Sequence, residues 1–203
     1  KTAAKTKSKL IGTPFLFTAD DAIALTEVAA RYSTSWRVPD EERAASVVEL
    51  EKYVRYIATN LQLRAQNTPE KAKRPLANRE AARAYRAYLS FFQDPAQRTA
   101  MLQNYADALS GAGKHWESAR QYERIARENA ASEAEPIHDA LAEYREANQG
   151  PDGKRRFRRV QAREGQKALG EYYVRAYPHG KDARSIAFGL GGVASLIRQT
   201  TPA

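Results

Sequence analysis

Alanine is the most abundant residue of this 203-residue chain, with 37 occurrences, and many arginine, glutamate, leucine and glutamine residues accompany it. These side chains lose little rotamer freedom in a helix and therefore favour helix over strand. Proline and glycine, which interrupt helices, number only 9 and 11. No segment shows the alternation of β-branched and polar residues that is typical of strands. The composition therefore predicts an all-α protein.

Capping residues and prolines divide the chain into about eight helices joined by short turns. Thr18 precedes two aspartates and predicts a first helix start, because a hydroxyl caps the helix and acids favour the positive end of its dipole. Pro39, followed by three acids, predicts a second start. Pro75 interrupts a helix-forming segment, so we place the third main start near Leu76. The expected helices cover about 18–33, 39–66, 76–94, 96–111, 114–130, 134–148, 154–177 and 181–198.

The net charge of +9 is carried by the two ends of the chain. Four lysines and no acid occupy residues 1–9, and residues 150–203 carry a net charge of +7. We therefore expect a mobile basic arm over residues 1–10, a helical-repeat body over 11–149 and a basic C-terminal helical hairpin over 150–203. A near-neutral body between basic ends makes the total charge a weak argument for nucleic-acid binding.

Several classes of chemistry are excluded or disfavoured by residue type. The absence of cysteine excludes disulfides, zinc–thiolate and iron–sulfur sites and cysteine nucleophiles. The histidines are isolated, none shares a metal-ligand spacing with a carboxylate, and we expect His115 and His179 at the surface. The longest apolar stretch, residues 186–197, is shorter than the ~20 residues that span a bilayer. We expect no enzyme activity, no catalytic residues, no metal, no cofactor and no transmembrane segment.

Residues 99–132 have the pattern of a complete helix–turn–helix unit. Apolar and small residues share one face of the first helix, Gly113 stands in the turn, and small and aromatic residues face back from the second helix. The residues of this pattern are Leu102, Tyr105, Ala106, Leu109, Gly113, Ser118, Tyr122 and Ile125. The unit resembles the tetratricopeptide repeat (TPR). It departs from the family where Ile125 replaces the usual alanine and where residues 129–131 lack the closing proline.

The resemblance extends beyond this unit, but fewer positions match the pattern there. Residues 81–95 resemble the second helix of a preceding repeat, and residues 133–198 match loosely. The sequence of residues 85–92 and 105–113 also looks like that of repeat proteins of the Gram-negative cell envelope, and this resemblance implies a periplasmic or envelope location. The family implies antiparallel helix pairs stacked as an α-solenoid whose inner wall binds a peptide or protein. The alternative interpretation is an ordinary alanine-rich helical bundle.

The resemblance also implies positions for a binding groove. In the matching repeat these positions fall on Ala100, Gln103, Asp107 and Ser110. Some members of the family use a lysine and asparagine pair to hold a C-terminal carboxylate, but Gln103 and Asp107 occupy those places here. We therefore expect a partner-binding groove at Gln103, Asp107 and Ser110 that does not take this ligand.

A run of cations at the start of the seventh expected helix is the strongest local anomaly. Its members are Lys154, Arg155, Arg156, Arg158, Arg159, Arg163 and Lys167. Cations at a helix start oppose the helix dipole. The run indicates either a docking patch for an acidic protein surface, an anionic lipid headgroup or nucleic-acid phosphates, or a solvated face with internal ion pairs. We expect Phe157 on the apolar side, which disfavours base stacking and so the nucleic-acid version.

Three functions remain open on these grounds. We prefer a non-enzymatic scaffold for protein–protein interactions within a multiprotein assembly, with a protein or peptide, including an acidic one, as partner. The first alternative is a basic helical module that binds RNA or another polyanion through residues 154–167 and the N-terminal arm. The second is the non-catalytic helical part of a larger enzyme or machine, since the chain starts without methionine. We expect an apolar side of the last helix to contact a partner chain or further repeats: Ile186, Phe188, Leu190, Val193, Leu196 and Ile197.

Overall fold

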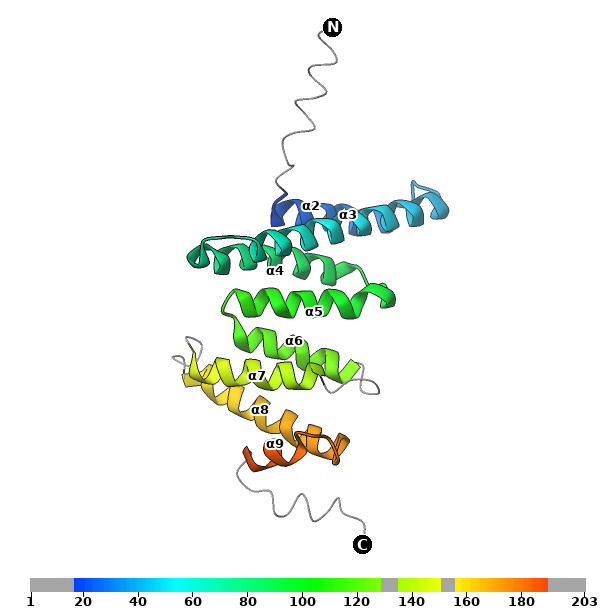
Figure 1. The fold of residues 1–203 in the computed structure, drawn as a ribbon. Coiled ribbons are helices and arrows are strands. Elements are labelled where there is room, and N and C mark those ends of the chain that lie inside the picture. Colours follow the sequence, from blue (N-terminus) through cyan, green and yellow to red (C-terminus); the bar gives the residue numbers. More distant parts are fainter. Residues whose placement is uncertain (1–16, 129–134, 151–155, 190–203) are drawn as a thin grey trace.

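The computed structural model describes residues 17–128, 135–150 and 156–189, and in these ranges the chain is helical without any strand (Figure 1). The described ranges contain eight α-helices and one short 3₁₀-helix. Their bounds are α2 Ala19–Ser33, α3 Asp40–Gln66, η1 Lys71–Lys73, α4 Arg74–Phe91, α5 Pro95–Gly111, α6 His115–Glu128, α7 Glu135–Gln149, α8 Arg156–Ala176 and α9 Ala183–Gly189. The prediction of an all-α protein with about eight helices is confirmed.

The helices stack in the order in which they follow one another along the chain. Each α-helix packs against the next, from α2 and α3 at one end to α9 at the other (Figure 1). Only α2 adds an extensive contact with a helix that is not its neighbour in sequence, since it also packs on α4. The described part of the chain is therefore a solenoid-like stack of antiparallel helices, as predicted.

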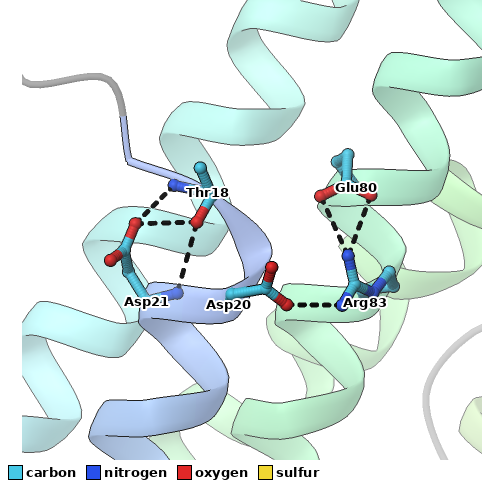
Figure 2. A network of polar contacts seen from close by, with 5 residues as sticks. All are labelled: Thr18, Asp20, Asp21, Glu80 and Arg83. Atoms are coloured by element: carbon cyan, nitrogen blue, oxygen red, sulfur yellow. Dashed lines mark hydrogen bonds and ion pairs between the residues drawn. The ribbon is translucent and has the colours of Figure 1, made fainter.

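The start of α2 follows the predicted capping pattern. The Thr18 side chain accepts a hydrogen bond from the Asp21 backbone N–H (3.4 Å), and the Asp21 carboxylate accepts one from the Thr18 backbone N–H (2.7 Å). Figure 2 shows this capping box, in which the hydrogen bonds from Thr18 lower the pKa of Asp21. The adjacent Asp20 forms an ion pair with Arg83 of α4 (2.5 Å), which also contacts Glu80 (3.1 Å). The cap and the ion pair together position α2 on α4.

One predicted helix start was wrong. The helix α4 begins at Arg74 rather than near Leu76, with Pro75 inside its first turn. Proline is tolerated there because the first N–H groups of a helix have no partner within it. The residues just before it form the 3₁₀-helix η1, so the chain turns without the break that Pro75 suggested.

Some predictions concern parts of the chain outside the described residues. These are the basic arm over 1–10, the repeat end at 129–131, Lys154, Arg155, and the last predicted helix beyond Gly189. Of that helix, α9 is the described part, and its Phe188 is 87% exposed.

The buried side chains of the described residues form two clusters that meet at α5. Met101, Tyr105 and Leu109 of this helix belong to the cluster of α2, α3 and α4. Leu102 and Ala106 belong to the cluster shared with α6, α7, α8 and α9. Both faces of α5 are therefore covered, and neither half of the stack is complete without it.

The α5–α6 hairpin is a helix–turn–helix unit whose two helices pack closely together. The apolar and small residues that its two helices contribute to the repeat pattern are buried, whereas Gly113 in the turn is exposed. Ser118 is fully buried, and its Oγ donates a hydrogen bond to the Ala106 carbonyl (2.9 Å), which requires a close approach of the two helices. Gly113 has a φ of +72°, a left-handed conformation that glycine adopts without the penalty a Cβ brings. Small residues thus occur where the backbone geometry demands them.

A second kind of contact joins consecutive helices through buried tyrosines. In three cases the tyrosine hydroxyl donates a hydrogen bond to a carboxylate on the preceding helix. The pairs are Tyr88 with Glu51 (2.6 Å), Tyr122 with Asp107, and Tyr144 with Glu123 (2.6 Å). Burial, strengthened by the bonded carboxylate, raises the pKa of each tyrosine, so the hydroxyl stays protonated and remains a donor.

Candidate functional site

The predicted groove residues of α5 separate into free and engaged positions. Ala100 and Gln103 are exposed, and Gln103 makes no hydrogen bond within the described ranges. Asp107 is exposed but accepts the hydrogen bond from the buried Tyr122. Ser110 is half-buried, and its hydroxyl donates to Glu143 Oε1 of α7 (2.7 Å). The structure therefore leaves Ala100 and Gln103 facing solvent, while Asp107 and Ser110 hold neighbouring helices.

Glu143 connects three helices and was not recognised as a site residue from the sequence. One of its carboxylate oxygens binds Ser110, and the other lies 2.8 Å from Nδ1 of His115, the first residue of α6. The prediction that His115 is a surface residue was wrong, since its side chain is only 21% exposed. Through Glu143, the helix α7 covers His115, and a contact with a residue so distant in the sequence cannot be predicted from the local pattern. Serine, histidine and glutamate also form the catalytic triads of hydrolases, in which the serine hydroxyl donates its hydrogen bond to the imidazole. Here the Ser110 hydroxyl donates to Glu143 instead, so the three side chains have a different arrangement.

The surroundings of Glu143 are acidic. Partial burial raises the pKa of Asp139 on α7, and the negative charges of Glu135, Asp107 and Glu143 raise it further, against a smaller opposing effect of His138. Among the residues that the structure describes, no three histidine, aspartate or glutamate side chains gather in a geometry suited to a metal ion. We call the surface formed by the exposed residues Ala100, Gln103 and Asp107 of α5 and the half-buried Asp139 of α7 the acidic wall.

The raised pKa of Asp139 predicts a pH-dependent gain from Asp139→Asn. Ionised Asp139 destabilises the folded state at neutral pH, and this penalty disappears as the pH falls through its folded pKa towards the unfolded value of 3.8. The variant should therefore have a higher Tm than the wild type at pH 7, by up to about 3 °C for a chain of this size, and the difference should vanish near pH 4. Thermal unfolding followed by circular dichroism checks this. A variant that is less stable at pH 7 would contradict it.

One member of the predicted basic patch is engaged inside the molecule. Arg158 forms an ion pair with Glu117 of α6 (2.7 Å), and its guanidinium lies 5.0 Å from the ring centre of Trp116. Its side chain is 24% exposed. It therefore ties α8 to the start of α6 instead of facing a partner. Glu117 and Trp116 could not be found from the sequence, because they are distant from Arg158 along the chain.

The remaining described cations of the patch face solvent together. Arg159, Arg163 and Lys167 are exposed, and their spacing of four residues places them along one side of α8. Lys154 and Arg155 fall outside the described residues, and Arg156 is placed only as the first residue of α8. The predicted patch thus becomes a shorter cationic stripe.

Two residues of this stripe line a hollow of about 370 Å³ between α7, α8 and α9. Arg163 and Lys167 meet Arg145 of α7 there, and within the described residues none of the three forms an ion pair. We call this space the cationic hollow; its other lining residues are Leu141, Gln166, Ser185, Ile186 and Gly189. Arg145 was missed from the sequence, because it stands between two glutamates in the local pattern.

The described chain is thus an all-α protein of stacked helical hairpins that carries an acidic wall and a cationic hollow. Comparison with protein-family models, with curated proteins and with solved structures finds no match in any of the three. Within the described ranges, none of the helices combines the length and the apolar character that crossing a membrane requires.

Proposed function

We propose that this protein is a non-enzymatic, TPR-like scaffold for protein–protein interactions that works as a component of a multiprotein assembly. The observation that carries the proposal is the α5–α6 hairpin. The resemblance rests on three of its residues: the small, buried Ser118, the aromatic Tyr122, and Gly113 with its left-handed backbone conformation. A placement in the periplasm or envelope of a Gram-negative bacterium belongs to the same proposal and rests on the resemblance of residues 85–92 and 105–113.

The stacked architecture supports a binding role. The described helices pack mainly against their neighbours in sequence, and such helical stacks offer long continuous surfaces to partners. On the acidic wall, Ala100 and Gln103 are exposed on the same side of α5, three residues apart. These two positions can be changed without breaking any described hydrogen bond. Asp107 is a poorer probe, because altering it also removes the partner of the Tyr122 hydroxyl.

A capture experiment tests the acidic wall as a binding surface. The double variant Ala100→Arg/Gln103→Arg should lose a protein partner that wild-type protein retains from a lysate of the source organism after nuclease treatment. Two bulky cations at the centre of such an interface should weaken binding by about 100-fold. Far-UV circular dichroism should show an unchanged helix content, since both side chains are exposed.

The matched control is Ala24→Arg/Gln66→Arg, which adds the same charges at exposed positions of α2 and α3. It should retain the partner. Equal retention by both double variants would contradict a partner site on the acidic wall. The absence of any nuclease-resistant protein partner would contradict the scaffold itself.

The cationic stripe of Arg159, Arg163 and Lys167 supports a second candidate, a module that binds RNA or another polyanion. The nuclease arm of the same experiment separates the two functions. A scaffold keeps its partner after nuclease treatment, whereas a polyanion module loses what it has bound.

A further inference from the structure

We infer that the cationic hollow between α7, α8 and α9 binds an acidic segment of a partner protein. In this arrangement carboxylates of the partner lie on Arg145, Arg163 and Lys167, and apolar partner side chains lie on Leu141 and Ile186. The inference rests on the proposed scaffold function and adds to it a second contact surface and the chemistry of the occupant.

The first argument is the uncompensated charge of the hollow. Several arginines elsewhere in the described residues have acidic partners: Arg55 with Glu51, Arg83 with Asp20, Arg98 with Glu128, Arg124 with Glu128 and Arg127 with Glu123. Arg145, Arg163 and Lys167 line one hollow and have no such partner in those ranges. Like charges brought together repel one another, so an anion bound among them removes an existing penalty.

The segment that follows α9 in the sequence carries no acidic side chain. Residues 190–203 continue from Gly189, which lines the hollow, and they contain no aspartate or glutamate side chain. Their only ionisable side chain is the cation Arg198. Residues 190–203 therefore supply no acidic side chain to neutralise the hollow.

The lining also indicates which kind of anion fits. Leu141 and Ile186 are half-buried and give the hollow an apolar part, which suits the side chains of a peptide. None of the described residues that line the hollow is aromatic and able to stack on a base. Separate carboxylates interspersed with apolar side chains meet these conditions best.

A peptide-binding measurement on the full chain tests the inference. The probe is a fluorescein-labelled peptide of alternating glutamate and leucine, followed by fluorescence anisotropy at low salt. The variant Arg163→Gln/Lys167→Gln should bind it about tenfold more weakly than the wild type, because two of the three cations are removed. The matched variant Arg175→Gln/Lys181→Gln removes the same charge from exposed positions beyond the hollow and should change the affinity by less than about twofold.

Three results would overturn the inference. Equal weakening by both variants would show attraction to net charge alone. An equally tight interaction with a peptide in which glutamine replaces glutamate would show an apolar occupant. Tighter binding of oligouridylate than of the peptide, lost in Arg163→Gln/Lys167→Gln, would assign the hollow to nucleic acid.

The capture experiment on the acidic wall separates this inference from the proposed function. A partner retained by Arg163→Gln/Lys167→Gln but lost by Ala100→Arg/Gln103→Arg leaves the scaffold in place and removes the hollow from its contact surface. A partner lost by both supports both. Thermal unfolding of each variant is the control. An unchanged Tm would show that a lost partner reflects the altered surface residues and not unfolding of the variant.

Discussion

Gly165→Val is expected to destabilise the protein by about 3 kcal/mol, at the upper end of what overpacking costs in a protein interior. A Cβ at Gly165 of α8 would lie 2.5 Å from Cζ of Tyr144 on α7. The tyrosine has no room to move, because it is 1% exposed and its hydroxyl is bound to Glu123. Urea denaturation followed by circular dichroism measures the loss.

Alanine at the same position separates two opposing effects. Gly165→Ala gains about 1 kcal/mol of helix propensity, but the clash with Tyr144 should exceed this gain and leave a net destabilisation. The matched change Gly111→Ala meets only the carboxamide of Asn78, which can move at the cost of its exposed hydrogen bond to the Arg74 carbonyl, so it should be close to neutral. Combining Gly165→Ala with Tyr144→Leu should recover the propensity gain relative to Tyr144→Leu alone. A simple stabilisation by Gly165→Ala would contradict the close approach of α7 and α8.

Leu102→Ala and Leu109→Ala should each destabilise the protein by about 2–5 kcal/mol, the usual cost of removing a buried leucine side chain. Both residues are 1% exposed and lie two turns apart on α5. They nevertheless belong to different clusters, since Leu109 packs with α2, α3 and α4, and Leu102 with α6, α7, α8 and α9. The same substitution on one helix should therefore weaken different halves of the molecule.

Hydrogen exchange followed by mass spectrometry distinguishes the two halves. Leu109→Ala should increase amide exchange in α2, α3 and α4, and Leu102→Ala should increase it in α6, α7 and α8. Each variant is the control for the other, because helix propensity changes equally in both. Identical exchange patterns would contradict two clusters and would indicate one cooperative core.

The elements of the fold that could be predicted are those with local causes. The Thr18 cap, the turn at Gly113 and the end of α8 before Pro178 depend on residues within a few positions of each other. The periodicity of Leu102, Ala106 and Leu109 correctly indicated burial. It did not indicate that these residues enter two different clusters, because that depends on which helices cover each face of α5. The start of α4 was misplaced because Pro75 terminates a helix or begins one according to its position, which is set by the preceding turn.

The candidate sites could be predicted only in part. Gln103 is exposed and Arg163 and Lys167 share one side of α8, as helical spacing implies. The partners of the other site residues come from helices that are distant in sequence. Examples are Glu143 with His115 and Glu117 with Arg158. Arg145 belongs to the cationic hollow for the same reason, since α7, α8 and α9 must pack together before it meets Arg163.

The stacking of each helix on its sequence neighbours also has a consequence for how the chain acquires its structure. Contacts between adjacent helices close short loops, which costs little chain entropy, and proteins dominated by such contacts fold fast. During synthesis, α2, α3 and α4 can bury most of their cluster as soon as they have been made, and α5 then completes it before α7 exists. Leu102 and Ala106 of α5 then provide the apolar surface against which α6 and the later helices pack. In this sequence of events α5 is the last part of one folding unit and the first part of the next.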